Sequence, residues 1–179
     1  RAYMAKHKYS NTTSADLWAA LEAASGKPVE KLASDWTTQP GFPVIKVSQV
    51  CKDGKREVTL SQEQFRLDEP APEKRLWHVP VQVGKVDGKS AYTLLSGPST
   101  TVTQSCDGVL VVDPFSVGFF RVQYDQASFD ALAAQVAKLP DATRLKLQAD
   151  AWGMAMADRM PLADYFKLIG KYDKENRGA

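Results

Sequence analysis

The sequence of 179 residues has little of the chemistry that metal sites and thiol catalysis need. It contains only two cysteines, Cys51 and Cys106, and two histidines, His7 and His78. Two thiols exclude a structural zinc site made of cysteines alone. Neither histidine has a second histidine four residues away, so the zinc-binding H-E-x-x-H helix is absent. We expect His78 to be a half-exposed strand residue and His7 to be solvated.

Long apolar runs and a dominant charge are missing as well. No stretch of about 18 apolar residues occurs, so we expect no membrane-spanning segment. The net charge is +2, and basic and acidic residues are interspersed, which argues against a nucleic-acid-binding protein. The hydrophobic fraction of 44% is typical of a globular protein that can form a core. The termini indicate no compartment.

Motifs for nucleophilic catalysis and for nucleotide binding are also lacking. The sequence has no G-x-S-x-G, no P-loop and no G-x-G-x-x-G. The carboxylates Asp68, Glu69 and Glu73 lie among prolines, a pattern typical of a solvated loop. We therefore predict no catalytic, cofactor-binding or metal-binding residue in this chain.

The two cysteines leave two interpretations open. Each lies beside a turn signal, in VCKDGK and in SCDGV. They can pair if those turns meet at one end of a sheet. The pattern favours two isolated thiols over a disulfide.

What is present falls into three regions, and the first, residues 1–42, is helical. Thr13 and Asp16 form a capping-box pattern before an apolar stripe, and Gly26 is placed to end that helix. Pro28 begins a second helix, which the sequence QPGFP ends. The tryptophans of this region, Trp18 and Trp36, fall on apolar stripes. We expect both, and Trp77 further on, to pack in a core rather than to stack on a ligand.

Residues 43–124 change to short strands bounded by glycine, proline or aspartate. We expect strands at residues 43–51, 56–65, 76–83, 90–96, 99–105, 108–113 and 119–125. The D-G-K sequences after Lys52 and Val86 are hairpin turn signals. About seven strands at this spacing predict a small antiparallel β-sandwich, so the fold class is α+β with helical segments at both ends.

Residues 125–179 return to the helical period. Asp125 precedes a helix on which Phe129, Leu132, Val136 and Leu139 align. Pro140 ends this helix. The next is expected to bury Leu145, Ala149, Trp152 and Met156, and a third, opened by Pro161, is expected to bury Leu162, Phe166 and Ile169. Successive short helices of this kind indicate the start of a helical stack.

The two ends carry no start or stop signals. No capping residue precedes residues 1–8, and the last helical pattern stops in KENRGA. We expect the chain to be an internal piece of a larger protein, and frayed termini of an ordinary domain are the alternative.

Four segments in order resemble the aminopeptidase N family of zinc metallopeptidases. The first runs from residue 9 into the first strand and includes Asn11, Asp16-Leu17-Trp18, Trp36-Thr37-Thr38-Gln39 and Gly41-Phe42-Pro43. The others are VTLSQEQF, Trp77-His78-Val79-Pro80-Val81, and GFFRVQYD from Gly118 to Asp125. The resemblance covers residues 9–125. The departures from the family pattern are mild: Phe119 and Phe120 replace tyrosines, and Asp113 and Gln123 replace asparagines.

The resemblance implies an architecture. Residues 1–42 would be the helical tail of the metallopeptidase catalytic domain, residues 43–124 the β-sandwich domain, and residues 125–179 the first helices of the C-terminal helical domain. The family's zinc ligands and catalytic glutamate would lie before Arg1, so zinc is expected in the parent enzyme and not in this piece.

Two functions follow as hypotheses. The first is a non-catalytic spacer fragment of a zinc-dependent aminopeptidase, inactive alone, whose partners are the rest of the same polypeptide and, through the parent, peptide substrates. The alternative is an independent β-sandwich binding module with helical flanks, which would need an exposed aromatic platform.

Overall fold

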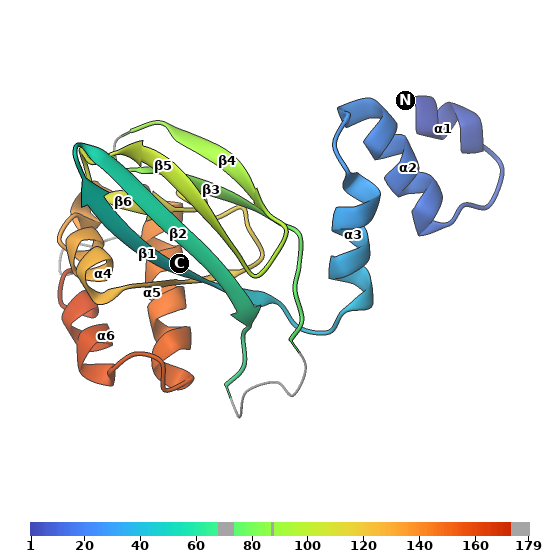
Figure 1. Ribbon diagram of the computed structural model, residues 1–179. Coiled ribbons are helices and arrows are strands. Elements are labelled where there is room, and N and C mark those ends of the chain that lie inside the picture. The colour runs from blue at the N-terminus through green and yellow to red at the C-terminus, as the bar shows by residue number, and fades with distance from the viewer. Residues whose placement is uncertain (68–73, 87, 173–179) are drawn as a thin grey trace. The chain divides into compact units, whose positions relative to one another are not determined.

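The computed structural model describes residues 1–67, 74–86 and 88–172 (Figure 1). The acidic loop residues Asp68, Glu69 and Glu73 lie outside these residues. The chain divides into two compact units, residues 1–40 and residues 41–179. The second unit contains both the strands and the helices that follow them. The three-domain division expected from the sequence stays a prediction.

The first unit consists of three helices: α1 (Ala2–His7), α2 (Ser14–Ser25) and α3 (Val29–Thr38). Thr13 and Asp16 form the predicted capping box, in which the Thr13 amide donates to the Asp16 carboxylate at 2.8 Å. Gly26 ends α2 in the left-handed conformation, with φ of 62°. Capping therefore works here as the sequence predicts.

No helix residue of the first unit is buried. Trp18 and Trp36 are half-buried, and the α2 stripe residue Leu21 is 44% exposed. The stripes therefore exist without becoming a core, and of the three tryptophans predicted to be core residues only Trp77 is fully buried.

The second unit contains seven strands in its described residues, as predicted. They are β1 (Pro43–Lys52), β2 (Lys55–Gln64), β3 (Val79–Lys85), β4 (Ser90–Leu95), β5 (Ser99–Ser105), β6 (Leu110–Val112) and β7 (Arg121–Tyr124). One sheet has the order β5-β2-β1-β7 and the other the order β4-β3-β6. This confirms the α+β class with a sandwich-like pair of sheets. One pairing is parallel, that of β7 with Val44–Val47 of β1, which residue alternation does not encode.

Alternation does determine which strand residues are buried. Every second residue of β2, from Arg56 to Gln62, is buried, and Trp77 beside them is 0% exposed. Trp77 lies just before β3. The Gln62 side chain binds its backbone: Nε2 donates to the Trp77 carbonyl at 2.8 Å, and Oε1 accepts from the Trp77 amide at 2.9 Å. A buried polar side chain is stable when satisfied in this way.

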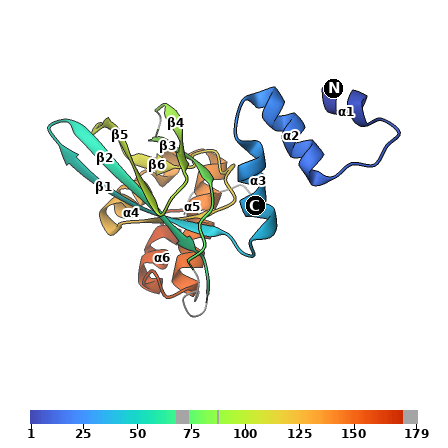
Figure 2. The same ribbon diagram turned by 45° about the vertical axis from the view of Figure 1, so that its right-hand side comes forward.

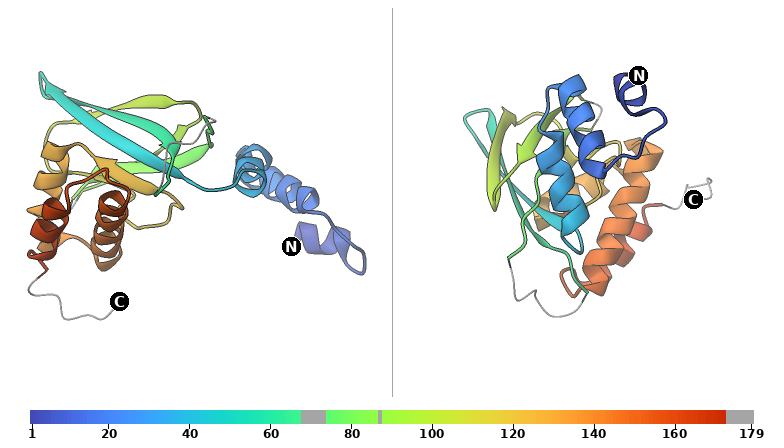
Figure 3. Two further views of the ribbon diagram at one scale, coloured as in Figure 1. Left: turned by 90° about the horizontal axis from the view of Figure 1, so that it is seen from below. Right: turned by 90° about the vertical axis from the view of Figure 1, so that its right-hand side faces the viewer.

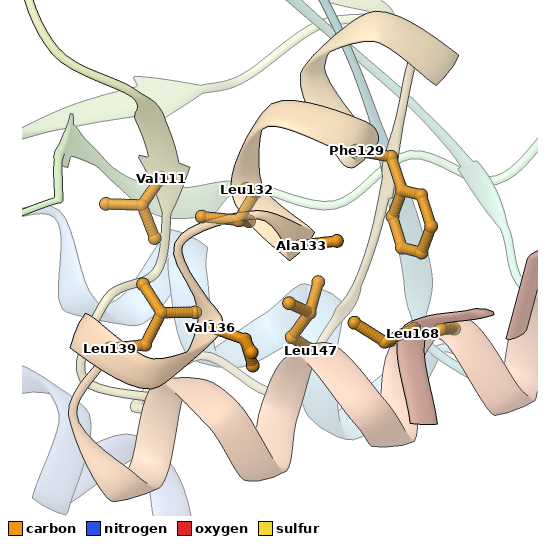
Figure 4. Packing of buried hydrophobic residues seen from close by; sticks show 9 residues of the cluster. Val111, Phe129, Leu132, Ala133, Val136, Leu139, Leu147 and Leu168 are labelled. Carbon is orange, nitrogen blue, oxygen red and sulfur yellow. The ribbon is translucent and has the colours of Figure 1, made fainter. Parts of the chain in front are cut away.

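The remaining helices, α4 (Gln126–Ala133), α5 (Asp141–Met156) and α6 (Leu162–Ile169), lie together beside the sheets (Figures 2 and 3). A short 3₁₀ turn, Val136–Lys138, follows α4, so the segment predicted as one helix is divided. The aligned residues nevertheless pack together as expected (Figure 4). The cluster comprises Val111, Phe129, Leu132, Ala133, Val136, Leu139, Leu147, Ala151 and Leu168.

The predicted inward faces of α5 and α6 are wrong. Helix α5 buries Leu147, Ala151 and Met154. It leaves Leu145 and Trp152 53% and 45% exposed. The other exposed apolar residues of this face are Met156, Leu162 and Phe166. The reason is that α5 is apolar on two faces, so periodicity alone cannot tell which face meets the sheets.

Candidate functional site

A buried cluster of charged side chains joins the sheets to α5. It begins at Asp113, directly after β6, which is 1% exposed and has φ of 53°. Aspartate and asparagine tolerate this left-handed conformation better than other side chains. The Asp113 carboxylate accepts from the amides of Val117 and Gly118, each at 3.1 Å. Asp113 thereby fixes the loop between β6 and β7.

Lys146 on α5 is the centre of the cluster. Its Nζ lies 3.6 Å from Asp113 Oδ2 and 3.3 Å from Asp150 Oδ2. It also donates to the Phe120 carbonyl at 2.7 Å, and it lies 5.0 Å from the centre of the Phe120 ring. One ammonium group therefore binds the loop after β6, the residue before β7, and its own helix. Its side chain is 10% exposed, so these interactions are little screened by water.

Asp150, one turn further along α5, is satisfied from the strand side. It accepts from the Val122 amide of β7 at 3.1 Å and lies 3.5 Å from Arg121 Nη1. Burial raises the pKa of Asp150, and the Lys146 charge opposes that rise. Arg121 also donates to the Ala149 carbonyl at 2.7 Å. Two carboxylates therefore face two cations, so the buried charges balance.

Gly153 permits this close approach of α5 to β7. A Cβ at this position would lie 2.6 Å from Cζ of Arg121. Any larger residue would displace the guanidinium group from Asp150.

Two hydroxyl groups complete the junction. The Tyr124 hydroxyl on β7 accepts from the Val112 amide of β6 at 2.9 Å, so it links the two sheets. Burial raises the pKa of Tyr124 above its ordinary value, which keeps the phenol neutral. Thr143 of α5 donates to the Pro114 carbonyl in the loop after β6.

The geometry does not suit catalysis. The cavity bordered by Tyr124, Thr143, Lys146 and Asp150 has a volume of about 10 Å³, at most the room for one water molecule. A substrate therefore has no access to these groups. A larger, open groove of about 440 Å³ lies between α4 and α6. Its charged rim includes Asp164 and Lys167, which pair with each other at 2.8 Å.

Metal chemistry finds no support in the described residues. They contain no group of three or more histidine, cysteine, aspartate or glutamate side chains placed to hold a metal ion. His78 is half-buried as predicted, but it lies just before β3 and not in the strand. His7 was predicted to be solvated but is half-buried, and its ring centre lies 5.1 Å from that of Tyr3.

The cysteines correct the prediction of two isolated thiols. Cys51 and Cys106 form a disulfide, with their Cα atoms 5.8 Å apart. The two turns do meet at one end of a sheet, because Lys55 of β2 pairs with Ser105 of β5. Sequence spacing could not show that β5 returns beside β2.

Sequence reasoning did not identify the charged junction. Its members are spread over a loop, a strand and a helix, and the only signal was Asp113, noted as a departure from an asparagine pattern. Among the described residues, no helix is both long and apolar enough to cross a membrane.

Comparisons with known proteins give the chain a family. Residues 110–177 match the family described as ERAP1-like C-terminal domain. The chain is 34% identical over 167 residues to Tricorn protease-interacting factor F2 of Thermoplasma acidophilum, which covers 93% of the chain and 20% of that protein. It is 35% identical over 195 residues to Aminopeptidase M1 of Arabidopsis thaliana (97% of the chain, 21% of that protein). It is 29% identical over 178 residues to Aminopeptidase N of Lactococcus lactis subsp. lactis (98% and 20%).

The chain thus spans about one fifth of the length of these relatives. The matches extend over nearly all of its residues, from the helices of the first unit to those after β7. On these grounds the chain belongs to the aminopeptidase N family.

Proposed function

We propose that this chain is a non-catalytic framework segment of a zinc-dependent aminopeptidase that removes N-terminal residues from peptides. The observation that carries the proposal is the Asp113–Lys146–Asp150–Arg121 cluster. It fastens α5 to the sheets through buried charges, and the small cavity beside it leaves those groups inaccessible to a substrate. A spacer needs such a junction, because a buried, balanced set of charges has one favourable geometry and resists sliding.

The metal and the chemical step would belong to other parts of the parent protein. There a zinc ion would activate a water molecule for attack on the peptide carbonyl. The residues of this chain would hold the sheets and the first C-terminal helices in a fixed geometry, and their partner would be the rest of the same polypeptide.

The exposed face of α5 and α6 supports this role. Leu145, Trp152 and Tyr165 border a shallow pocket of about 230 Å³, and Phe166 beside it is 62% exposed. A contiguous apolar face of this kind usually marks a surface that another element covers. In the proposed parent, further helices of the same polypeptide would cover it.

The test is to purify this chain and measure its zinc content and its hydrolysis of aminoacyl chromogenic substrates. We expect neither stoichiometric zinc nor turnover, while the full-length protein shows both. Turnover with one zinc per chain would contradict the proposal.

One observation favours the alternative of an independent binding module. Phe115 and Phe119, in the loop before β7, are 58% and 71% exposed, as an aromatic platform would require. Saturable binding of a peptide or glycan to this chain, lost in Phe115→Ser and retained in the full-length protein, would support that alternative. If the parent covers this loop, the full-length protein will not bind the same probe.

A further inference from the structure

The end of the four-stranded sheet that carries the disulfide has little apolar support. Strand β7 pairs with β1 only as far as Val47; beyond it, Gln49 still donates to Asp125 and Ser128, but no further strand lies on this side of β1. Val50 on this part is 66% exposed. At this end of β2 the inward-facing residue is charged, Arg56. The next inward-facing residues of the strand, Val58 and Leu60, are apolar. The hydrophobic effect therefore contributes little to holding this end together.

Three ties replace the missing apolar contacts. Arg56, which is 4% exposed, donates from Nη2 to the carbonyls of Cys106 and Gly108. Lys85 of β3 pairs with Asp107 at 2.6 Å. The Cys51–Cys106 disulfide then joins the end of β1 covalently to the segment after β5. All three interactions involve residues 106–108, so the disulfide is one of several interactions that hold this end of the sheet together.

The solvent exposure of the cysteines determines in which compartments the disulfide can persist. Cys51 is exposed, so a thiol reductant in the surrounding solution can reach the bond. Glutathione and thioredoxin keep accessible thiols reduced in the cytosol, whereas disulfides form and persist in oxidising compartments. A joint that depends on an exposed disulfide therefore requires an oxidising environment.

We infer that the protein containing this chain matures in an oxidising compartment, where the Cys51–Cys106 disulfide is a permanent structural bond. It forms by thiol–disulfide exchange. The Cys51 and Cys106 thiols lose two protons and two electrons, and the disulfide of an oxidant, a thiol oxidoreductase or a small disulfide, is reduced to two thiols. Both cysteines of these 179 residues are used, so no thiol within them is left to reopen the bond by exchange.

The direct test determines the state of the two cysteines in the full-length protein from its native cells. Cells are quenched in acid and labelled with a light alkylating reagent. They are then reduced and labelled with a heavy reagent, and the two peptides are compared by mass spectrometry. We expect at least about nine-tenths of both peptides to carry the heavy label, as for a structural disulfide. A mostly light-labelled pair, or a ratio that follows the redox state of the cell, would overturn the inference.

A second measurement separates a structural bond from an incidental one. In the oxidised 179-residue chain, the double variant Cys51→Ser with Cys106→Ser should lower Tm by on the order of 5–15 °C. A reductant should lower the Tm of the unaltered chain by a similar amount. The same reductant should leave the double variant unchanged, which serves as the control. An equal Tm for the oxidised chain and the double variant would show that the bond supports nothing.

Discussion

The two units of this chain use similar sequence signals to different effect. Helix α2 has a full capping box and a glycine stop, and both α2 and α3 have apolar stripes, yet they bury no residue. The second unit has strands of ordinary alternation, and it buries Trp77 and Leu60 completely. The difference teaches that local signals specify an element, while a core requires elements that can face one another. The strands and helices of the second unit do face one another and form a core. The first unit has three short helices, and their apolar stripes stay at least partly exposed.

The largest expected effect tests the charged junction of the second unit. Lys146→Met removes the ammonium group that Asp113 and Asp150 share, and it leaves both carboxylates buried without it. Breaking a buried charge cluster in this way costs about 3–5 kcal/mol of unfolding free energy. Urea unfolding followed by circular dichroism measures the change.

The control is Lys167→Met on α6, where the lysine is 75% exposed and also pairs with a carboxylate on its own helix. An exposed pair contributes little, so its midpoint should not change. Equal midpoints for the Lys146 and Lys167 variants would refute the junction.

A matched pair of leucines compares the two units directly. Leu60→Ala in β2 creates a cavity at a position with 0% exposure and should cost about 2–5 kcal/mol. Leu21→Ala in α2 removes the same atoms at a position with 44% exposure and should cost less than about 1.5 kcal/mol. Unfolding of both variants in urea gives the two values. If Leu21→Ala were as costly as Leu60→Ala, the first unit would have a core of its own.

In the full-length protein the same pair sharpens the comparison. If the parent covers the α2 stripe, the cost of Leu21→Ala should rise toward that of Leu60→Ala. An unchanged cost would mean that this stripe faces solvent in the parent as well.

A smaller effect tests capping in the first unit. Thr13→Ala removes the hydroxyl that the Asp16 amide donates to, and this change should cost about 1 kcal/mol of α2 stability. Thr13 also lowers the pKa of Asp16 through its amide and its hydroxyl. Carboxyl carbon NMR should therefore find the Asp16 titration at higher pH in the variant. An unshifted titration would show that the capping box is not formed in solution.

The smallest effect concerns Asp107 in the second unit. Hydrogen bonds from Lys85 and Ser105 lower the pKa of Asp107 to about 2. A lowered pKa favours the charged form in the fold. Its contribution to stability is therefore present above the unfolded value of about 3.9 and is lost as the pH falls toward 2. Carboxyl NMR on Lys85→Met should show the Asp107 titration moving up toward its ordinary value. If Asp107 in the unaltered chain titrated with a midpoint near 4, its pair with Lys85 would not help to hold the disulfide end of the sheet.

Much of the fold could be predicted from the sequence because its signals are local. Thr13, Gly26 and the Asp53-Gly54 turn act within a few residues, and the alternation of β2 marks its buried face directly. What could not be predicted depends on long-range placement. The parallel pairing of β7 with β1 and the approach of Cys106 to Cys51 follow from how the chain returns, which no local period encodes.

The charged junction escaped prediction for a related reason. Asp113, Lys146 and Asp150 each resemble an ordinary surface residue in the sequence, and only the packing of α5 on β7 makes them a buried cluster. The same packing shows why the inward face of α5 was misassigned. The helix is apolar on both sides, and the larger residues, Leu145 and Trp152, are on the outer one.

One measurement tests the central contrast between the two units most directly. Amide hydrogen exchange is followed in α2 and α3, and in strands β2 and β3 as an internal reference, for this chain alone and for the full-length protein. We predict that β2 and β3 are equally protected in both, because their core lies within the second unit. The amides of α2 and α3 should exchange quickly in the chain alone and slowly in the full-length protein. Slow exchange of α2 and α3 in the chain alone would contradict the account.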